Sequence, residues 1–268
     1  MEWNGAHVVI TGGSSGIGEA VAVVAATRQA KVTIIARDPA RLNQAAARIR
    51  TAAPGAVVGV ISADVSDQGT ITQALDRAIV ERGPVDVLVC SAGVTRPGRF
   101  LELEDETFRS MMDVDYYGTL WPVRAVAPAM VARGRGSIVG VSSAAALVGV
   151  YGYSAYGAAK FAVRGLFETL RTELAPHGVH VGCAYPPDVD TPMLAEEEQW
   201  KPDQTKAIAG SIKPISARQV ANAIIEGIDS RRAEIYADRQ TRALARTVAM
   251  VPGVYRRLFD RRVRQTPG

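Results

Sequence analysis

Short apolar runs rich in β-branched residues alternate with longer amphipathic segments along most of this chain. Runs of this kind, bounded by glycine, proline or polar residues, are typical of buried strands, and the segments between them have the spacing of helices that cover a sheet. The predicted strands are residues 6–11, 31–36, 56–62, 85–90, 137–142, 179–185 and 233–236. The predicted helices are residues 19–27, a segment ending near 53, residues 67–82, a segment ending near 176, and residues 216–230. This alternation predicts one α/β domain built on a parallel sheet.

A glycine-rich turn, here called the glycine turn, follows the first predicted strand and leads into an alanine- and valine-rich helix. Its residues are Gly12, Gly13, Ser14, Ser15, Gly16, Ile17 and Gly18. Glycine lets the backbone approach a pyrophosphate closely, and the free amides at the start of a helix attract its charge. Strand, glycine turn and helix are the context that a dinucleotide-binding site requires, although such glycines also occur in ordinary tight turns.

The segment from Ser143 to Lys160 carries the residues with the most distinctive chemistry. Tyr156 and Lys160 are four residues apart, so in a helix both side chains leave the same face. The pKa of a free tyrosine is about 10. A neighbouring ammonium group stabilises the phenolate, so a tyrosine beside one is a candidate acid or base at lower pH. Ser143, just after the predicted strand 137–142, could place a hydroxyl beside the phenol. The Tyr-x-x-x-Lys spacing alone also occurs by chance in many helices.

The glycine turn and the trio Ser143, Tyr156 and Lys160 occur in the order and spacing of the short-chain dehydrogenase/reductase family, which this chain resembles from about residue 5 to residue 236. The resemblance implies a single Rossmann-type doubly wound parallel sheet with helices on both faces. It also implies that the glycine turn binds NADP(H), that the trio is catalytic, and that Tyr156 and Lys160 contact the cofactor as well. Members of the family are commonly homodimers or homotetramers, and the same is expected here.

Further cofactor contacts follow from the resemblance. Ala36, at the end of the predicted strand 31–36, cannot hold a ribose, so Arg37, together with Arg41, favours the 2′-phosphate of NADP(H). The alternative is an arginine that is only solvated at the start of a helix. The other contacts implied are Asp64 and Val65 at the adenine, Ala92 and Gly93 at the cofactor backbone, and Val189 and Thr191 at the nicotinamide carboxamide and the phosphate.

Two residues depart from the family pattern. Cys90 replaces an asparagine, which weakens one structural hydrogen bond. Asp115 stands where relatives have an asparagine counted as a fourth catalytic residue, because it holds a kink and a water in the proton relay to Lys160. Aspartate lacks the amide donor, so the departure bears on the relay more than on the reaction. The family has a helix over residues 104–133, and Pro122 within it is expected to kink or break it.

Residues 184–192 resemble the 3-ketodihydrosphingosine reductases of that family. Pro186-Pro187 replaces the usual Pro-Gly, and the likeness continues through residues 195–202. It implies a substrate lid at about 193–213 and NADPH-dependent reduction of a ketone to a secondary alcohol. The expected substrate is a hydrophobic one, a long-chain lipid ketone such as 3-oxosphinganine. Two alternatives stay open: a generic reductase or dehydrogenase of steroid, retinoid or 3-oxoacyl substrates, and a non-catalytic NADP(H)-binding sensor.

The composition limits the compartment and the ligands. No apolar stretch reaches the roughly 18 residues of a membrane-spanning helix, and residues 1–4 are not the basic start of a signal peptide, so a cytoplasmic protein is expected. Cys90 and Cys183 lie in apolar runs and are expected to be buried thiols. The three histidines show no ligand spacing, and no metal site is expected.

Positive charge is concentrated at the end of the chain. Residues 237–268 contain eight arginines and two acidic residues, so this tail has a net charge of +6, whereas residues 1–236 have a net charge of −2. A basic amphipathic tail could lie on the anionic cytoplasmic face of a membrane, as a peripheral contact, or could dock on a second subunit. Nucleic-acid binding is not expected, because no recognition module accompanies the arginines. The catalytic domain is accordingly expected at 1–236, with the tail at 237–268.

Overall fold

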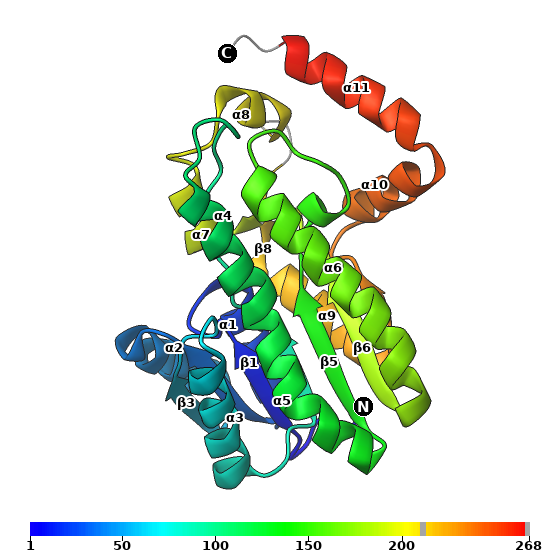
Figure 1. Cartoon of the computed structure of the whole chain (residues 1–268). Coiled ribbons are helices and arrows are strands. Elements are labelled where there is room, and N and C mark those ends of the chain that lie inside the picture. Colours follow the sequence, from blue (N-terminus) through cyan, green and yellow to red (C-terminus); the bar gives the residue numbers. More distant parts are fainter. Residues whose placement is uncertain (210–212, 266–268) are drawn as a thin grey trace.

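A parallel sheet of seven strands forms the centre of the computed structural model, which describes residues 1–209 and 213–265. The strand order is β3-β2-β1-β4-β5-β6-β9 (Figure 1). The strands are β1 (His7–Thr11), β2 (Lys31–Ala36), β3 (Val58–Ser62), β4 (Val87–Cys90), β5 (Gly136–Val141), β6 (Val179–Ala184) and β9 (Glu234–Ile235). The chain builds outward from β1 in one direction and then from β4 in the other, which is the predicted doubly wound arrangement.

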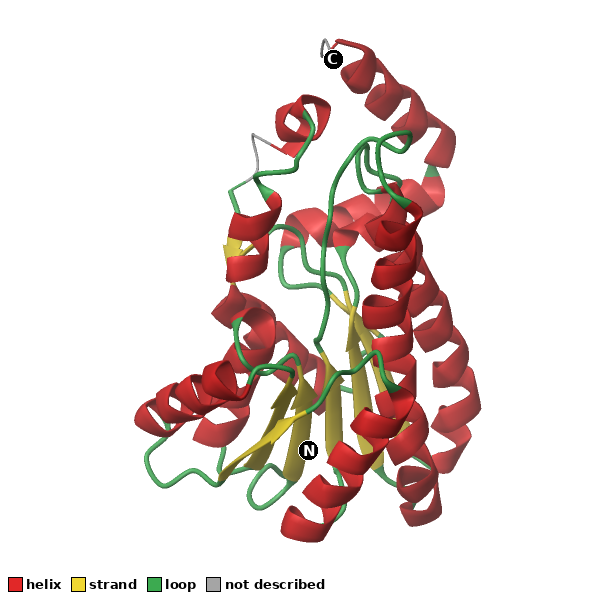
Figure 2. Cartoon of the chain, turned by 60° about the vertical axis from the view of Figure 1, so that its left-hand side comes forward, coloured by secondary structure: helices red, strands yellow, loops and turns green. Residues whose placement is uncertain are grey.

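Helices cover both faces of this sheet (Figure 2). On one face α1 packs against α2 and α9, and on the other α3 packs against α5, with α6 along β6. The bounds are α1 (Gly16–Thr27), α2 (Pro39–Ala52), α3 (Gln68–Arg82), α4 (Asp105–Met111), α5 (Gly118–Arg133), α6 (Ser154–Leu174) and α9 (Ala217–Asp229). The fold class predicted from the alternation of strands and helices is therefore confirmed.

The core is divided by the sheet into two apolar clusters. Successive residues of a strand point to opposite faces, so Val8 and Ile10 join the cluster under α1 and α9, whereas Val9 joins the cluster under α3 and α5. Both faces are covered, which explains why the strands read as continuous apolar runs without polar alternation. Cys90 and Cys183 lie in these strands as buried free thiols, as predicted.

The segment 104–133 differs from the expected continuous α-helix. It consists of α4, a π-helical turn over Met112–Tyr117, and α5. Pro122 does not break the helix, although a break was one of the two outcomes predicted, and Pro128 also lies inside α5. The departure from α geometry comes earlier in the chain, at the π-helical turn, which contains Asp115. π-helical turns inserted in α-helices are often found at functional sites.

Several short elements gather beyond the C-terminal ends of the strands (Figure 1). They are β7 (Val189–Asp190), α7 (Pro192–Glu197), α8 (Asp203–Ala209) and β8 (Ile215–Ser216). β7 and β8 pair as a separate two-stranded parallel sheet. The predicted lid at 193–213 corresponds to α7 and α8, and its residues 210–212 lie outside the described part of the chain.

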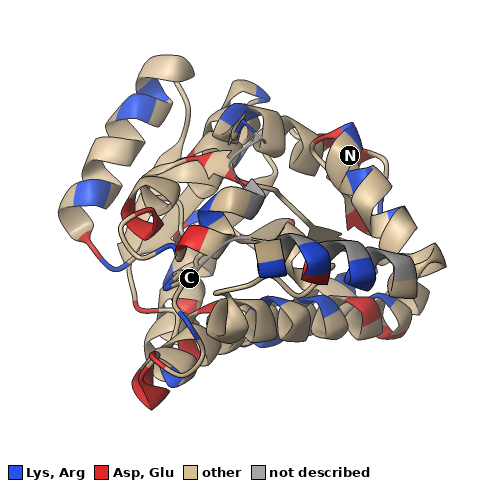
Figure 3. Ribbon diagram, turned by 90° about the horizontal axis from the view of Figure 1, so that it is seen from above, with Lys and Arg blue, Asp and Glu red and all other residues tan. Residues whose placement is uncertain are grey.

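The basic tail forms two helices, α10 (Arg239–Met250) and α11 (Pro252–Gln265). α10 packs on the body of the protein, because Leu244 and Val248 contact the core cluster under α6. α11 lies beyond α10, and Figure 3 shows it across this end of the molecule with its basic positions in blue. Within the described ranges, no helix is both long enough and apolar enough to cross a bilayer. Residues 266–268 of the predicted tail are outside those ranges.

Candidate active site

A cavity of about 1220 Å³ opens at the C-terminal edge of the sheet, beyond the paired strands β1 and β4, between which the strand order reverses. This is the place where doubly wound sheets bind their ligands. Of the site residues predicted from the sequence, those that line the cavity are Gly12, Ser14, Ser15, Gly16, Ile17, Arg37, Arg41, Asp64, Val65, Ala92, Gly93, Ser143, Tyr156, Lys160, Val189 and Thr191. Gly18 and Asp115 are absent from the lining and lie behind it. Among the described residues, no group of three or more His, Cys, Asp or Glu side chains is arranged to hold a metal ion.

The glycine turn is pressed against the end of β4. Gly12 has φ +69°, and a Cβ atom at this position would lie 2.6 Å from the backbone nitrogen of Ala92. Gly18 in turn packs against the carbonyl of Gly12. These contacts are with backbone atoms, which cannot move aside. The first turn of α1 faces the cavity, because Gly16 and Ile17 line it. The backbone amides of this turn are free, because Ser15 caps the helix without a side-chain hydrogen bond.

Arg37 and Arg41 lie at the end of the cavity next to β2. Both are exposed, and within residues 1–209 and 213–265 neither forms an ion pair with a carboxylate. Asp38 between them caps α2, because its Oδ1 accepts hydrogen bonds from the backbone nitrogens of Ala40, at 2.8 Å, and of Arg41, at 3.2 Å. This carboxylate is engaged by the helix, whereas the two guanidinium groups are available to an anion.

Tyr156 and Lys160 lie one turn apart on α6, beside Ser143. Ser143 follows β5, and its Oγ accepts a hydrogen bond from the backbone nitrogen of Ala145 at 3.1 Å. The ammonium of Lys160 is 5.5 Å from the centre of the Tyr156 ring and donates a hydrogen bond of 3.3 Å to the carbonyl of Val141. The helix and the end of β5 thus bring together the three side chains that the sequence predicts as a trio.

Burial and charge oppose each other at this trio. Burial raises the pKa of Tyr156 above its ordinary value, although the Lys160 ammonium and the Ser143 hydroxyl act to lower it. Lys160 thus acts in the predicted direction, but burial outweighs it. Burial acts to lower the pKa of Lys160, but the Asp115 carboxylate and Tyr156 together raise it above its ordinary value. The site therefore holds a protonated phenol beside an ammonium group.

Asp115 is completely buried in the π-helical turn and contacts Lys160 directly. Its Oδ1 is 3.3 Å from the Lys160 Nζ and accepts a hydrogen bond of 3.0 Å from the backbone nitrogen of Val94. Its Oδ2 is buried without a hydrogen-bond partner among the described residues. Burial raises the pKa of this carboxyl, and Lys160 opposes that shift. The resemblance placed a water relay here, and the structure adds a direct ion pair.

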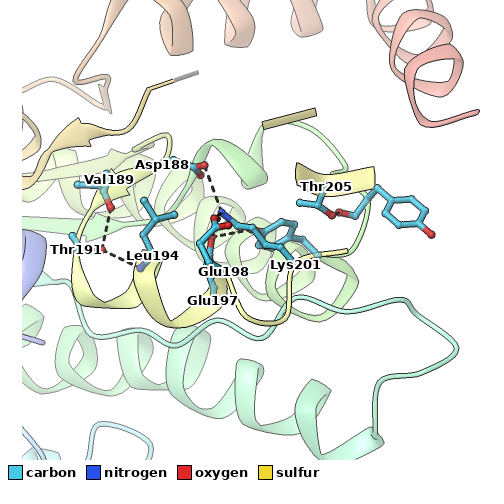
Figure 4. Close-up of polar contacts among 10 residues, drawn as sticks. Asp188, Val189, Thr191, Leu194, Glu197, Glu198, Lys201 and Thr205 are labelled. Carbon is cyan, nitrogen blue, oxygen red and sulfur yellow. Dashed lines mark hydrogen bonds and ion pairs between the residues drawn. The ribbon is translucent and has the colours of Figure 1, made fainter. Parts of the chain in front are cut away.

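A set of polar side chains near the predicted lid was missed by the sequence analysis. Tyr153 lies beside Tyr156 with ring centres 5.8 Å apart, and its hydroxyl donates a hydrogen bond of 3.0 Å to Glu197 Oε1. Lys201 pairs with Glu197 at 2.8 Å (Figure 4). The i, i+4 spacing of Glu197 and Lys201 was a usable signal for their pairing. The contact with Tyr153 spans 44 residues of sequence, and nothing in the local sequence indicates it.

Comparison with known proteins agrees with this geometry. The model of the short chain dehydrogenase family matches residues 6–202. A 3-dehydrosphinganine reductase of Danio rerio is 42% identical over 84% of this chain and 69% of its own length, and a 3-ketodihydrosphingosine reductase of Bos taurus is 43% identical over 83% of this chain and 68% of its own.

Solved structures give the same result for the fold. A short chain dehydrogenase/reductase from Burkholderia phymatum in complex with NAD superposes with a TM-score of 0.84 at 27% identity, over 95% of this chain and 96% of its own. A short-chain dehydrogenase from Sphingobium yanoikuyae in complex with NADPH gives a TM-score of 0.79 at 27% identity, over 95% of each chain. The resemblance inferred from the glycine turn and the trio is confirmed.

Proposed function

Since this chain belongs to the short-chain dehydrogenase/reductase family, we propose that it is an NADPH-dependent reductase that converts 3-oxosphinganine to the corresponding secondary alcohol. The observation that carries the substrate is the identity of more than 40% to reductases named for this ketone over more than four fifths of the chain. The cavity supports it, because apolar side chains suited to a long alkyl chain line it, namely Val94, Val148, Val150, Met193, Leu194 and Leu244.

The residues present fit a dinucleotide. The close backbone packing of the glycine turn leaves a cradle that a side chain on Gly12 would obstruct, and the first turn of α1 presents its amides to that cradle. The turn, Asp64, Val65, Ala92, Gly93, Val189 and Thr191 would hold the cofactor, with Tyr156 and Lys160 at its reactive end. Arg37 and Arg41 would bind the 2′-phosphate, because the neighbouring Asp38 carboxylate is engaged by α2. When bound, NADPH supplies the hydride.

In this proposal Tyr156 donates the proton to the carbonyl oxygen of the substrate. A buried phenol with a raised pKa is protonated at neutral pH, which suits a general acid. Ser143 orients the carbonyl oxygen by a hydrogen bond. Lys160 stabilises the phenolate that remains after the proton has left, and Asp115 holds the Lys160 ammonium in place. These roles rest on the geometry of the trio and on the family's chemistry.

The test is NADPH oxidation, followed optically, with 3-oxosphinganine and with a short 3-oxoacyl thioester, each repeated with NADH. Preferential turnover of the sphingoid ketone with NADPH supports both the substrate and the role of Arg37. Preference for the thioester would leave only a general reductase. Binding of NADPH without turnover of either ketone would support the non-catalytic sensor instead.

The family match indicates a small-molecule substrate, and because members of the family are often oligomers, we also propose that the chain assembles with further copies of itself. For the tail we propose a peripheral contact with an anionic membrane surface, with residues 1–236 as the catalytic domain. α10 begins at the cavity, where Thr241 and Leu244 line it, and ends in the exposed Met250 and Val251. A lipid substrate would thus enter beside a basic, partly apolar surface. Flotation with anionic but not with neutral vesicles supports this contact, and a tail that is protected only in a homodimer or homotetramer would refute it.

A further inference from the structure

Glu197 is a buried carboxylate in the wall of the substrate cavity. It lies at the end of α7, is 7% exposed, and lines the cavity together with Asp188, Tyr153 and Lys160. A charged side chain that is nine-tenths buried is costly unless other groups compensate its charge. The groups that compensate Glu197, and those that do not, therefore indicate what else this wall is able to bind.

Three carboxylates at this wall contact the same ammonium group, that of Lys201. Lys201 contacts Glu197 at 2.8 Å, Asp188 at 3.8 Å and, at shorter range, Glu198 (Figure 4). Within residues 1–209 and 213–265, none of these carboxylates has an ion pair with any other cation. Two negative charges of the group are thus unbalanced by a cation. The two carboxylates that face the cavity, Asp188 and Glu197, are placed to receive a positively charged ligand.

This wall lies next to the proposed proton donor. The Tyr153 hydroxyl donates its hydrogen bond to Glu197 Oε1, and the ring of Tyr153 is 5.8 Å, centre to centre, from the ring of Tyr156. Glu197 is close enough to Tyr156 that its charge acts to raise the pKa of the phenol. A single aromatic ring thus separates Glu197 from the residue that would protonate the ketone oxygen, so a ligand group at Glu197 belongs to the part of the substrate nearest the ketone.

The ketone of the proposed function carries a positively charged group close to its carbonyl group. 3-Oxosphinganine has an amino group on the carbon atom next to its carbonyl carbon, whereas the rest of its chain is apolar. We propose that Glu197, assisted by Asp188, binds this ammonium group and so selects 2-amino ketones over ketones without the amine. This inference rests on the proposed function and adds to it a residue that determines specificity.

The competing explanation is that the charged group only fastens α7 to the loop that carries Lys201. Glu198 separates the two explanations, because it contacts the same ammonium, has a side chain that is 52% exposed and does not line the cavity. Glu198→Gln removes a contact of the fastening and leaves the cavity wall intact. Glu197→Gln keeps the shape and the hydrogen-bonding capacity of the wall but removes its charge.

The experiment compares two ketones on each protein: 3-oxosphinganine and its analogue with hydrogen in place of the amino group. For the full-length wild type, Glu197→Gln and Glu198→Gln, kcat/KM is measured for both ketones with saturating NADPH, and the ratio of the two values is taken. The ratio is independent of how much of each preparation is folded. A charge-assisted hydrogen bond is typically worth a factor of about ten or more, so we expect the wild-type ratio to favour the amino ketone by at least about tenfold.

The expected result is that Glu197→Gln lowers the ratio to near one, while Glu198→Gln keeps the wild-type ratio. A wild-type ratio near one, or a Glu197→Gln variant with the wild-type ratio, overturns the inference and leaves the proposed function standing, because both ketones are still reduced. An equal fall in the ratio in both variants shows that the group only fastens the lid, and also overturns it. A wild type that reduces neither ketone removes the proposed function, and the inference falls with it.

Discussion

The two ends of the cavity are built by different means. At the end next to β1 and β2, the shape is set by backbone atoms: the glycine turn packs on the backbone of residues 91 and 92, just after β4, and helix amides face the cavity. At the end next to the predicted lid, the shape is set by side chains on α7 and on loops, where Lys201, Glu197, Asp188 and Tyr153 contact one another across several segments. The first end is held by the sheet, and the second by ion pairs and hydrogen bonds.

This difference matches what each end would bind. A pyrophosphate and a ribose are the same for every reaction of a dinucleotide, so a rigid backbone cradle suits them. A substrate differs from one enzyme to the next, and side chains on short elements can change without disturbing the sheet. The trio of Ser143, Tyr156 and Lys160 lies between the two ends, on α6 and after β5. Substitutions at matched positions in the two ends should therefore have different consequences.

The largest effect is expected for Tyr156→Phe, compared with Tyr153→Phe three residues earlier. If Tyr156 is the general acid, its loss lowers kcat/KM by at least about 100-fold while NADPH still binds. Tyr153→Phe removes only the hydrogen bond to Glu197, so a change of a few-fold is expected, mainly in KM. Steady-state kinetics with the sphingoid ketone and NADPH titrations measure both. Near wild-type turnover by Tyr156→Phe would contradict the assignment of the proton donor.

A smaller effect is expected for Gly12→Ala, compared with Gly152→Ala at the lid end. Both glycines have positive φ, +69° and +81°. A Cβ on Gly12 would meet backbone atoms of residues 91 and 92 at 2.6 Å, whereas a Cβ on Gly152 would meet side-chain atoms of Thr205, at 2.8 Å, and Pro202. Side chains can shift and the backbone cannot, so Gly12→Ala should weaken NADPH binding by at least about tenfold.

Gly152→Ala is the matched control for this substitution. It carries the same strain of a positive φ but lies at the lid end of the molecule, so its dissociation constant for NADPH should stay near that of the wild type. Fluorescence titration with NADPH measures both variants, and thermal unfolding reports how much stability each loses. Equal losses of NADPH affinity in the two variants would show that the rigid-backbone description of the first end is wrong.

A still smaller effect is expected for Arg37→Ser, at the end of the cavity next to β2. Without the guanidinium the 2′-phosphate of NADPH loses a charge-assisted partner, and the ratio of kcat/KM with NADPH to that with NADH should fall by about tenfold. Arg124, which is exposed on α5 and does not line the cavity, supplies a control for the loss of one positive charge. An unchanged cofactor ratio in Arg37→Ser would mean that this arginine is only solvated.

The sheet could be predicted from the sequence because its central strands are buried on both faces. All seven predicted strands form, and each end lies within two residues of its predicted position. Continuous apolar runs bounded by turns are a strong local signal. Pro122 was expected to kink or break the helix, but α5 continues through it, and the departure from α geometry is the π-helical turn that precedes α5.

The candidate site was readable only where it depends on local sequence. The glycine turn and the Tyr156–Lys160 spacing are local patterns, and the structure brings these residues into one cavity. Their catalytic and cofactor roles stay predictions until the variants above are measured. The pairing of Glu197 with Lys201 has a local i, i+4 spacing, but the contact of Glu197 with Tyr153 joins residues 44 positions apart, so no local pattern indicates it. The direct pairing of Asp115 with Lys160 was missed for the same reason.

The smallest effect is expected for Asp115→Asn, which restores the residue that the family resemblance leads one to expect. The Asp115 carboxylate acts to raise the pKa of Tyr156 and that of Lys160, so the amide should lower both. Reduction needs the protonated phenol, and activity is lost as the pH rises through the pKa of Tyr156. The alkaline limb of the pH profile of kcat/KM should therefore move to lower pH in the variant.

The pH profile of the reverse reaction gives a second test, because oxidation of the alcohol needs the phenolate form of Tyr156. In Asp115→Asn its rise with pH should begin at lower pH, so the two profiles shift together. Glu102→Gln, at an exposed position outside the cavity, controls for the loss of one negative charge and should leave both profiles in place. A variant whose profiles coincide with those of the wild type would mean that the ion pair of Asp115 with Lys160 positions the ammonium without setting the acidity of the phenol.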